Sequence, residues 1–285
     1  DRVNNEPTEW ASGTHEQIKR YLHTFNWAES ILLCHNTMFD GAILSWCFDI
    51  RPRVLADTLC MARALHGVEV GGSLHALSQR YSLGTKGTEV LDAIGKHRED
   101  FTTEELGRYG DYCVNDVELT YKLFMRMAKR FPKQEMRIID MTLRMFTDPM
   151  LDLDLGLLEQ HLANTKQIKE DLITSSGVTR EDLMSNNKFA ELLVSLDVAP
   201  PTKISPTTGK ETYAFAKNDE GFKALLEHED ARVQALVTAR LGTKSTLEES
   251  RTERFIGIAK RGKLPVPVRY YAAHTGRWGG DDKIN

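Results

Sequence analysis

The sequence predicts an α/β layer near the beginning of the chain, followed by a mainly helical region. Two short apolar runs, residues 30–35 and 53–57, suit buried strands, and a helical pattern precedes or follows each of them. Strands that alternate with helices are typical of α/β proteins. After about residue 70 the pattern is almost entirely helical, until β-branched and aromatic residues at 263–273 again favour strands.

The individual elements can be placed in chain order by the spacing of apolar residues. Helices are expected at residues 15–29, 37–48, 57–65, 74–81, 103–130, 133–146, 155–175, 187–196, 220–227 and 230–254. Residues 199–210 are rich in proline and threonine and include a glycine, which is typical of an exposed loop. We place a domain boundary at Pro132, which gives the domains 1–132 and 133–285.

Composition bounds the class of protein. The chain has 285 residues, of which 41% are hydrophobic and 27% charged, enough for one large or two ordinary domains. No apolar run approaches the roughly 20 residues of a membrane span, so we expect a soluble cytoplasmic protein, without a membrane partner and without oligomers. We interpret the cysteines as buried small hydrophobes, with no disulfide or zinc site. They are Cys34, Cys47, Cys60 and Cys113.

Charge is distributed unevenly along the chain. The formal net charge is −4, yet residues 240–285 carry ten Lys or Arg against five Asp or Glu. Attraction for phosphate groups would therefore be confined to that end. A solvated charged helix with a loop would produce the same charge count.

The first candidate site is the segment 34–40, with the sequence CHNTMFD, where a predicted strand ends and a helix begins. Side chains at the carboxyl ends of α/β strands face the crevice in which ligands bind. Asn36 and Asp40 are four residues apart, so a helix would place them on one face. The alternative is that Asn36 caps the helix and Asp40 is a solvated aspartate.

The second candidate site is Tyr112 and Asp116, again four residues apart in a strongly helical region. Phosphodiester cleavage by two metal ions needs carboxylates to hold the ions and a group to orient the attacking water. This pair supplies one carboxylate and one hydroxyl. The alternative is a core tyrosine beside a surface aspartate.

Together, the two segments resemble the second and third motifs of the DEDDy exonucleases, which have four acidic metal ligands and a tyrosine. The resemblance implies that Asp116 binds the catalytic metal, that Asp40 helps hold the other metal through water, and that Tyr112 positions the nucleophile. It also implies that Asn36 lies near the terminal nucleotide, and we interpret Asp57 as structural.

The first motif of this exonuclease family, an Asp-x-Glu on a strand, does not occur upstream of Asn36. Asp1, Glu6 and Glu9 are weak substitutes without a strand around them. We therefore expect that the amino-terminal strands of the ribonuclease H-like α/β domain are missing from this chain.

The third candidate region resembles the thumb and the start of the palm of family A DNA polymerases. The resemblance rests on residues 240–246 (RLGTKST), 270–278 (YYAAHTGRW) and 283–285 (KIN), and the Gly-Gly-Asp-Asp spacing at 279–282 is closer to phage-type enzymes. It implies that Lys244 and Thr246 hold backbone phosphates and that Arg277 donates to minor-groove acceptors. Such contacts check geometry rather than read sequence.

We expect a template-directed DNA polymerase of family A with a 3′-to-5′ proofreading exonuclease that uses two Mg²⁺ or Mn²⁺ ions. Expected partners are primer-template DNA, single-stranded 3′ ends and deoxynucleotides. The chain would hold a partial exonuclease domain, a mainly α thumb and the first palm strands, and would lack part of both active sites. Two alternatives are a stand-alone DEDDy nuclease for RNA or repair intermediates and a non-catalytic DNA-binding remnant.

Overall fold

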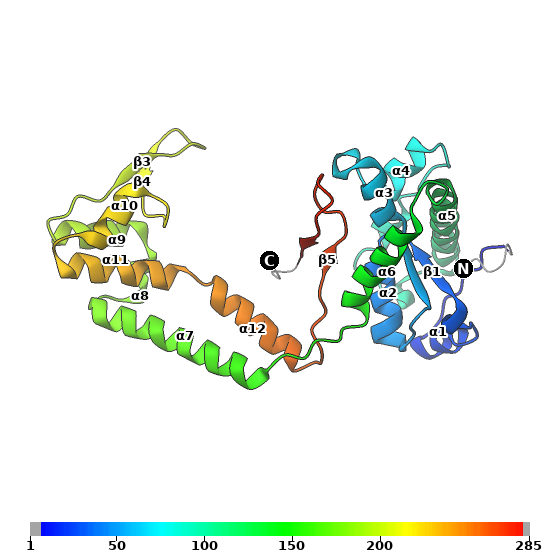
Figure 1. Ribbon diagram of the computed structural model, residues 1–285, viewed down its shortest axis with the longest axis horizontal. Helices are drawn as coiled ribbons and strands as arrows, with labels where there is room; N and C mark the ends of the chain where they lie inside the picture. Colours follow the sequence, from blue (N-terminus) through cyan, green and yellow to red (C-terminus); the bar gives the residue numbers. More distant parts are fainter. Residues whose placement is uncertain (1–6, 282–285) are drawn as a thin grey trace. The chain divides into compact units, whose positions relative to one another are not determined.

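The structure is a computed structural model that describes residues 7–281, and its helices and strands form two compact units (Figure 1). Unit 1 comprises the chain up to Leu151 together with the segment from Lys263 onward, and unit 2 comprises Asp152–Gly262. Asp1 and Glu6, part of the Gly-Gly-Asp-Asp spacing and the motif at 283–285 lie outside the described residues.

Unit 1 is built on a small parallel sheet. β1 (Ile31–Cys34) pairs with β2 (Val54–Asp57), with Ile31 opposite Val54 and Cys34 opposite Asp57. Each strand leads directly into a helix, α2 (Thr37–Ala42) after β1 and α3 (Thr58–His66) after β2. Both predicted strands and the alternation of strand and helix are confirmed.

Helices cover this sheet (Figure 1). α5 contacts β1, while α6 contacts β2 and α2. The further elements of unit 1 are α1 (His15–Leu22), α4 (Leu74–Arg80), α5 (Thr103–Met127), α6 (Lys133–Thr147), the π-helical turn η2 (Ile43–Cys47) and the 3₁₀ turns η1 (Trp27–Glu29), η3 (Val68–Val70), η4 (Glu89–Ala93) and η5 (Arg98–Asp100). The core between them is apolar and includes Leu55, Met61, Leu77, Leu119, Leu123, Ile139 and Leu143.

The two edges of this sheet differ. Along β2, polar side chains of α6 satisfy the backbone: Asp140 accepts the amide N–H of Leu55 at 2.8 Å, and Arg144 donates to the carbonyl oxygens of Pro52 and Arg53 at 2.8 and 2.9 Å. β1 pairs with β2 alone among the described strands, and Ile31 at its start is 63% exposed. One edge is therefore covered and the other is open.

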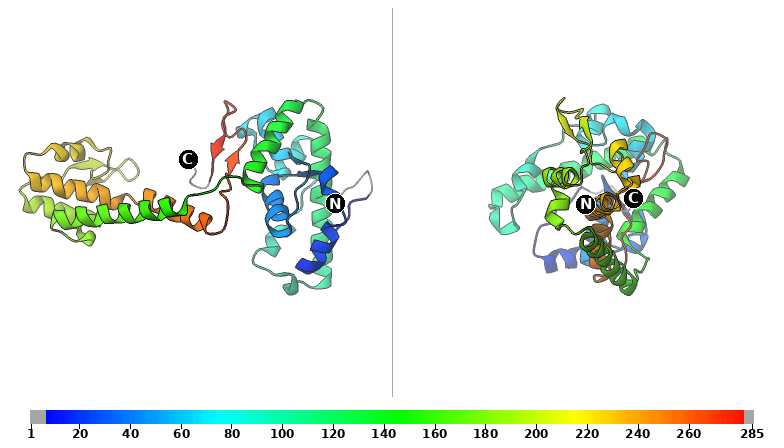
Figure 2. Two further views of the ribbon diagram at one scale, coloured as in Figure 1. Left: turned by 60° about the horizontal axis from the view of Figure 1, so that its bottom comes forward. Right: turned by 90° about the vertical axis from the view of Figure 1, so that its left-hand side faces the viewer.

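The segment after residue 263 returns to unit 1 and lies beside α6 (Figure 2). β5 (Val268–Arg269) pairs antiparallel with β6 (Gly279–Gly280). The strand predicted at 263–273 is thus much shorter, because Pro265 and Pro267 cannot donate to a ladder. Tyr270 is buried in the core of unit 1.

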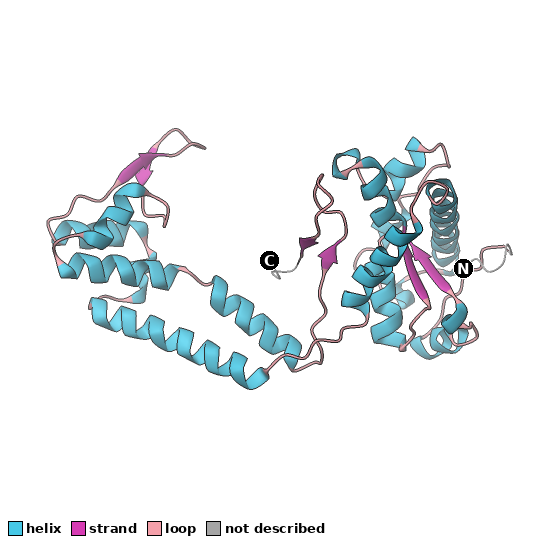
Figure 3. Cartoon of the chain, viewed as in Figure 1, coloured by secondary structure: helices cyan, strands magenta, loops and turns pink. Residues whose placement is uncertain are grey.

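Unit 2 is mainly helical (Figure 3). Its elements are α7 (Leu155–Ser176), α8 (Arg180–Met184), α9 (Asn186–Ser195), α10 (Glu220–Ala224), the turn η6 (Leu225–Glu227), α11 (Ala231–Lys244), α12 (Leu247–Ala259) and the hairpin strands β3 (Thr202–Ile204) and β4 (Glu211–Tyr213). α7 packs against α11 and α12, and a core that includes Phe189, Phe222 and Val233 joins the shorter helices.

Two predictions in unit 2 were wrong in detail, and one helix was missed. The single helix predicted at 230–254 is two helices, because the weak helix formers of the Gly-Thr-Lys-Ser-Thr run end α11 and Ser245 adopts an extended backbone. The loop predicted at 199–210 contains β3 and begins a hairpin with β4. α8 was missed, although the Thr179 side chain and Asp182 form a capping box that marks its start.

All four cysteines are free thiols. Cys60 is buried and Cys34 and Cys113 are half-buried, but Cys47 is exposed. The expectation of a buried side chain was wrong for Cys47 because η2 turns Leu44 and Ser45 inward instead. Within the described ranges, no helix combines the length and apolar character needed to cross a membrane.

Candidate functional site

Asp57 holds together the ends of the two parallel strands. Its carboxylate is 2% exposed and accepts backbone N–H groups from both strand–helix junctions. The donors are Asn36 at 3.2 Å, Thr37 at 2.9 Å, Leu59 at 2.7 Å and Cys60 at 3.3 Å. A carboxylate that accepts four backbone N–H groups serves the fold, so Asp57 is a structural residue, in agreement with its interpretation from the sequence.

Asn36 lies at the first of these junctions, with a left-handed backbone of φ 74° and ψ 53°. Asparagine adopts this conformation more readily than most residues. Asn36 occupies the N-cap position of α2, as the alternative interpretation proposed, but its side chain makes no capping hydrogen bond. The exposed side chain lines a hollow that also includes His35 and Arg63.

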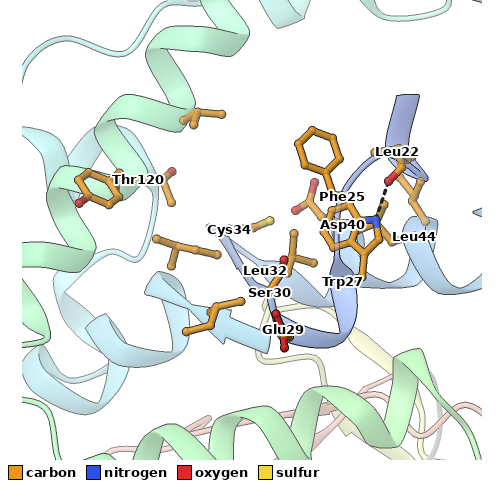
Figure 4. A pocket seen from close by; sticks show the side chains of 15 residues that line it. Leu22, Phe25, Trp27, Glu29, Ser30, Leu32, Cys34, Asp40, Leu44 and Thr120 are labelled. Atoms are coloured by element: carbon orange, nitrogen blue, oxygen red, sulfur yellow. Dashed lines mark hydrogen bonds between the residues drawn. The ribbon is translucent and has the colours of Figure 1, made fainter. Parts of the chain in front are cut away.

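Asp40 is half-buried on α2 and points into a hollow of about 590 Å³ beside β1 (Figure 4). Cys34, Phe25 and Thr120 line the same hollow. Burial raises the pKa of the Asp40 carboxyl, and the negative charge of Asp57 adds to the rise, while a hydrogen bond with Cys34 opposes it. Asp40 is therefore not the solvated surface aspartate of the alternative interpretation.

Tyr112 and Asp116 lie one turn apart on α5, and Lys86 joins them. The Lys86 ammonium group donates to Oδ2 of Asp116 at 2.6 Å and to the hydroxyl of Tyr112, and it lies 4.3 Å from the centre of the Tyr112 ring. Burial raises the pKa of Tyr112; the Lys86 ammonium group opposes this rise, and the Asp116 carboxylate adds to it. The phenol is thus protonated and hydrogen-bonded at neutral pH.

The two carboxylates approach β1 from different elements. Asp40 shares its hollow with Val117, Thr120 and Tyr121, which lie on α5 within the five residues after Asp116. Asp116 does not line that hollow, and its Oδ2 is directed to Lys86. That Asp40 and Asp116 serve one metal centre stays a prediction.

The donor set suits a hard divalent cation. Oδ1 of Asp116 is buried and has no hydrogen-bond partner among the described residues, which leaves one carboxylate oxygen available for a ligand. Mg²⁺ is commonly held by one or two carboxylates plus substrate phosphates and water. Asp40 and Asp116 each supply one carboxylate of this kind, and the described part of the chain brings no three or more His, Cys, Asp or Glu together as a metal site.

Lys244 and Thr246, the predicted phosphate contacts, lie in unit 2. Lys244 ends α11 and donates to the Asn186 side chain at 3.2 Å, and Thr246 is the exposed residue that precedes α12. A hollow of about 600 Å³ is lined by Lys244 together with Lys203 and Lys217. Burial and the nearby Arg240 lower the pKa of Lys244.

Arg240, part of the predicted basic region, is completely buried in unit 2. Its guanidinium group lies 4.2 Å from the ring centre of Phe189 and 4.8 Å from that of Phe215. It donates to the carbonyl oxygens of Leu183 at 2.6 Å and Ser185 at 3.2 Å. Burial lowers its pKa to about 10, so it remains charged at neutral pH but serves the core rather than the surface.

Arg277 lies in unit 1, in a tight turn that Gly276 makes possible with a φ of +75°. Its exposed guanidinium group contacts the hydroxyl of Thr275 at 3.2 Å. The structure thus places Asn36, Asp40, Tyr112, Asp116 and Arg277 in unit 1 and the other two predicted residues in unit 2.

Lys86 is the residue that sequence reasoning missed. It lies 26 residues before Tyr112, in a loop between α4 and η4, and no periodic pattern or motif links it to the helix that it contacts. Only the tertiary structure brings it to Tyr112 and Asp116.

These features define an α/β unit with an acidic site beside its parallel strands. Residues 12–132 match a family model described as 3′-5′ exonuclease, of the type found in DNA polymerase A. No curated protein sequence matches the chain.

A structural likeness extends over almost the whole chain. The chain is similar to a solved structure titled the POL domain of Pol1 from M. smegmatis in complex with DNA primer-template and dNTP. The TM-score is 0.54 and the sequence identity 16%, over 96% of this chain and 45% of the other. The chain thus spans less than half of that protein's length and shares its fold. The family match thus concerns the first part of the chain, and the structural match shows a similar fold.

Proposed function

We propose that unit 1 carries a 3′-to-5′ exonuclease site that removes nucleotides from the 3′ end of DNA. The observation that carries this proposal is the paired Tyr112 and Asp116 on α5, with one buried carboxylate oxygen free of any partner among the described residues. The match of residues 12–132 to a 3′-5′ exonuclease family supports it.

The chain's own residues have distinct roles in this proposal. Asp116 and Asp40 would hold divalent cations, Mg²⁺ or Mn²⁺, which when bound supply charge stabilisation and activate water. Tyr112 would orient the attacking water through its hydroxyl. Asn36, exposed at the end of β1, would contact the terminal nucleotide.

The open edge of β1 fits a further strand of the site. A strand that paired there would run past Asp40 and would cover the apolar lining of the hollow, as a paired edge normally does. Acidic residues on such a strand would add further carboxylates to those of Asp40 and Asp116 as ligands for the metal ions. We propose that the complete polypeptide provides this Asp-x-Glu strand.

We further propose that the complete polypeptide is a template-directed DNA polymerase of family A, acting in the cytoplasm. In this proposal unit 2 belongs to the thumb and β5 and β6 belong to the palm. Lys244 and Thr246 would hold phosphates, and Arg277 would donate to minor-groove acceptors. The similarity in fold to a Pol1 polymerase domain supports this assignment.

The exonuclease is tested by the variant Asp116→Ala in the complete polypeptide. The unchanged protein should degrade a 3′-labelled single strand only in the presence of Mg²⁺. In Asp116→Ala the rate should fall about 1000-fold or more, because a misplaced metal ion loses several kcal/mol of transition-state stabilisation. Tyr112→Phe should lower the rate about 100-fold through loss of orientation. Primer extension by both variants serves as the control for folding. Unchanged degradation by Asp116→Ala would refute the assignment.

The ion pair of Lys86 with Asp116 favours a second candidate, in which the exonuclease fold persists without metal and only binds DNA. A protein of this kind would bind single-stranded DNA equally well with and without Mg²⁺. It would also bind no Mn²⁺ in calorimetric titrations. The exonuclease would bind Mn²⁺, and the substitution Asp116→Asn would weaken that binding.

A further inference from the structure

Lys86 is held against α5 by a fixed loop. Thr85, its neighbour, accepts a hydrogen bond from the Asn115 side chain at 3.0 Å. Gly84 adopts a φ of +135°, and a Cβ there would lie 3.3 Å from the Leu119 side chain, so the backbone is close to α5 on this side as well. These two contacts anchor the backbone next to Lys86 against α5.

The ammonium group of Lys86 neutralises Asp116 where a cation would otherwise do so. It is 2.6 Å from Oδ2, with only 22% of the Lys86 side chain and 25% of the Asp116 side chain exposed. A lysine ammonium group is charged at neutral pH, and here it has a carboxylate partner within hydrogen-bond distance. A positive charge is thus built into the acidic site.

A divalent cation at Oδ1 of Asp116 and the ammonium group at Oδ2 would bind the two oxygens of the same carboxylate group. Two positive charges at that separation repel each other strongly when both are partly removed from water. The cation and Lys86 cannot both interact with Asp116 at full strength, so binding of one weakens the other.

We propose that Lys86 is an internal counter-ion of the exonuclease site, which positions Tyr112 and Asp116 while the site holds no metal and competes with the divalent cation for Asp116. The inference rests on the proposed function, because it requires Asp116 to be a metal ligand. Lys86 is a positioning residue in this account, since it acts through Tyr112 and Asp116.

The test is a calorimetric titration of Mn²⁺ alone into the complete polypeptide, without DNA. Lys86→Met should bind Mn²⁺ about tenfold more tightly than the unchanged protein, because the competing charge is gone. Lys86→Arg keeps the charge and should bind like the unchanged protein. Asp116→Asn added to Lys86→Met should abolish the gain.

Lys96→Met is the matched control. Lys96 also pairs with a carboxylate of α5, that of Glu105 at 3.7 Å, and also lies over an aromatic ring, that of Phe101 at 5.1 Å. Its loss should leave Mn²⁺ binding unchanged. If both lysine variants bound Mn²⁺ more tightly by the same factor, the gain would come from a general loss of positive charge, and the proposal would be overturned.

The remaining outcomes separate the two levels of inference. If Asp116→Asn weakens Mn²⁺ binding but Lys86→Met binds no more tightly than the unchanged protein, the role of Lys86 is refuted and the exonuclease site stands. If Asp116→Asn has no effect in either background, Asp116 is not a metal ligand and both proposals fail. Lys86→Gln, which keeps a hydrogen-bond donor without the charge, should repeat the gain and guards against a folding defect in Lys86→Met.

Discussion

At the scale of single residues, burial determines which side chains can change their charge. His35 is the clearest case, because its Nδ1 lies 2.9 Å from the Thr58 hydroxyl and its Nε2 2.8 Å from the Gly72 carbonyl oxygen. A carbonyl oxygen can only accept, so Nε2 carries the proton in the neutral ring and Nδ1 accepts from Thr58. The ring links the end of β1 to the loop before α4.

The pKa of His35 predicts how the stability of unit 1 depends on pH. Burial lowers this pKa below its usual 6.5, and the positive charge of Arg63 lowers it further. The charges of Asp57 and Asp116 and the hydrogen bond to Gly72 oppose this decrease. The folded state then binds fewer protons than the unfolded state, so stability is complete above pH 6.5 and falls as the pH drops further. Urea unfolding should show a lower midpoint at pH 5.5 than at pH 7.5.

Tryptophan fluorescence reports on unit 1 alone, since all four tryptophans lie there and unit 2 has none. They are Trp10, Trp27, Trp46 and Trp278. In His35→Gln the decrease between pH 7.5 and pH 5.5 should be smaller than in the unchanged protein. An equal decrease in both would contradict the role of His35.

At the scale of elements, Asp57 decides how the two strands enter their helices. It accepts N–H groups at the start of α2 and of α3, so a single carboxylate sets the geometry of both junctions. The left-handed backbone of Asn36 belongs to the first junction and is stabilised in the same way.

Replacement of Asp57 by Ala should destabilise unit 1 by about 3 kcal/mol or more, because several buried N–H groups lose their acceptor. Urea unfolding followed by tryptophan fluorescence measures this loss. Asp57→Asn retains one acceptor oxygen and should lose less. A change below about 1 kcal/mol in Asp57→Ala would show that water replaces the carboxylate.

At the scale of the whole molecule, unit 1 gathers chain segments that are far apart in the sequence. The predicted domain boundary at Pro132 coincides with the end of the matched exonuclease family, yet α6 and the segment from Lys263 pack in the same compact unit as β1 and β2. Compactness does not decide where one functional domain ends, so the division into 1–132 and 133–285 stays a prediction.

Tyr270 tests whether the returning segment contributes to this unit. The side chain is 5% exposed, packs in the core, and donates from its hydroxyl to Glu135 on α6. Tyr270→Ala should lower the stability of unit 1 by about 3–5 kcal/mol through the cavity it creates. Tyr270→Phe, which removes only the hydroxyl, should cost about 1 kcal/mol. If Tyr270→Ala were as stable as the unchanged protein in unfolding followed by tryptophan fluorescence, the result would contradict the packing of this segment.

Local patterns in the sequence were sufficient for most elements. The apolar runs at 30–35 and 53–57 became β1 and β2, and the 3.6-residue period located α5 and α6, because both depend on which neighbours in the chain share a face. The same patterns failed at Ser245, where poor helix formers divide the last helices of unit 2, and at Pro265 and Pro267, which shorten a strand.

The sequence by itself determined the order of strands and helices and the pairing of Tyr112 with Asp116, since helical geometry turns a spacing of four into a common face. The same expectation failed for Asn36 and Asp40, because Asn36 precedes α2 with a left-handed backbone and lines a different hollow from Asp40. Only the tertiary structure decided that Lys86 neutralises Asp116, that Arg240 is buried and that β1 keeps an open edge. Such contacts join residues distant in the chain, and they arise from how the elements pack, which no local periodicity encodes.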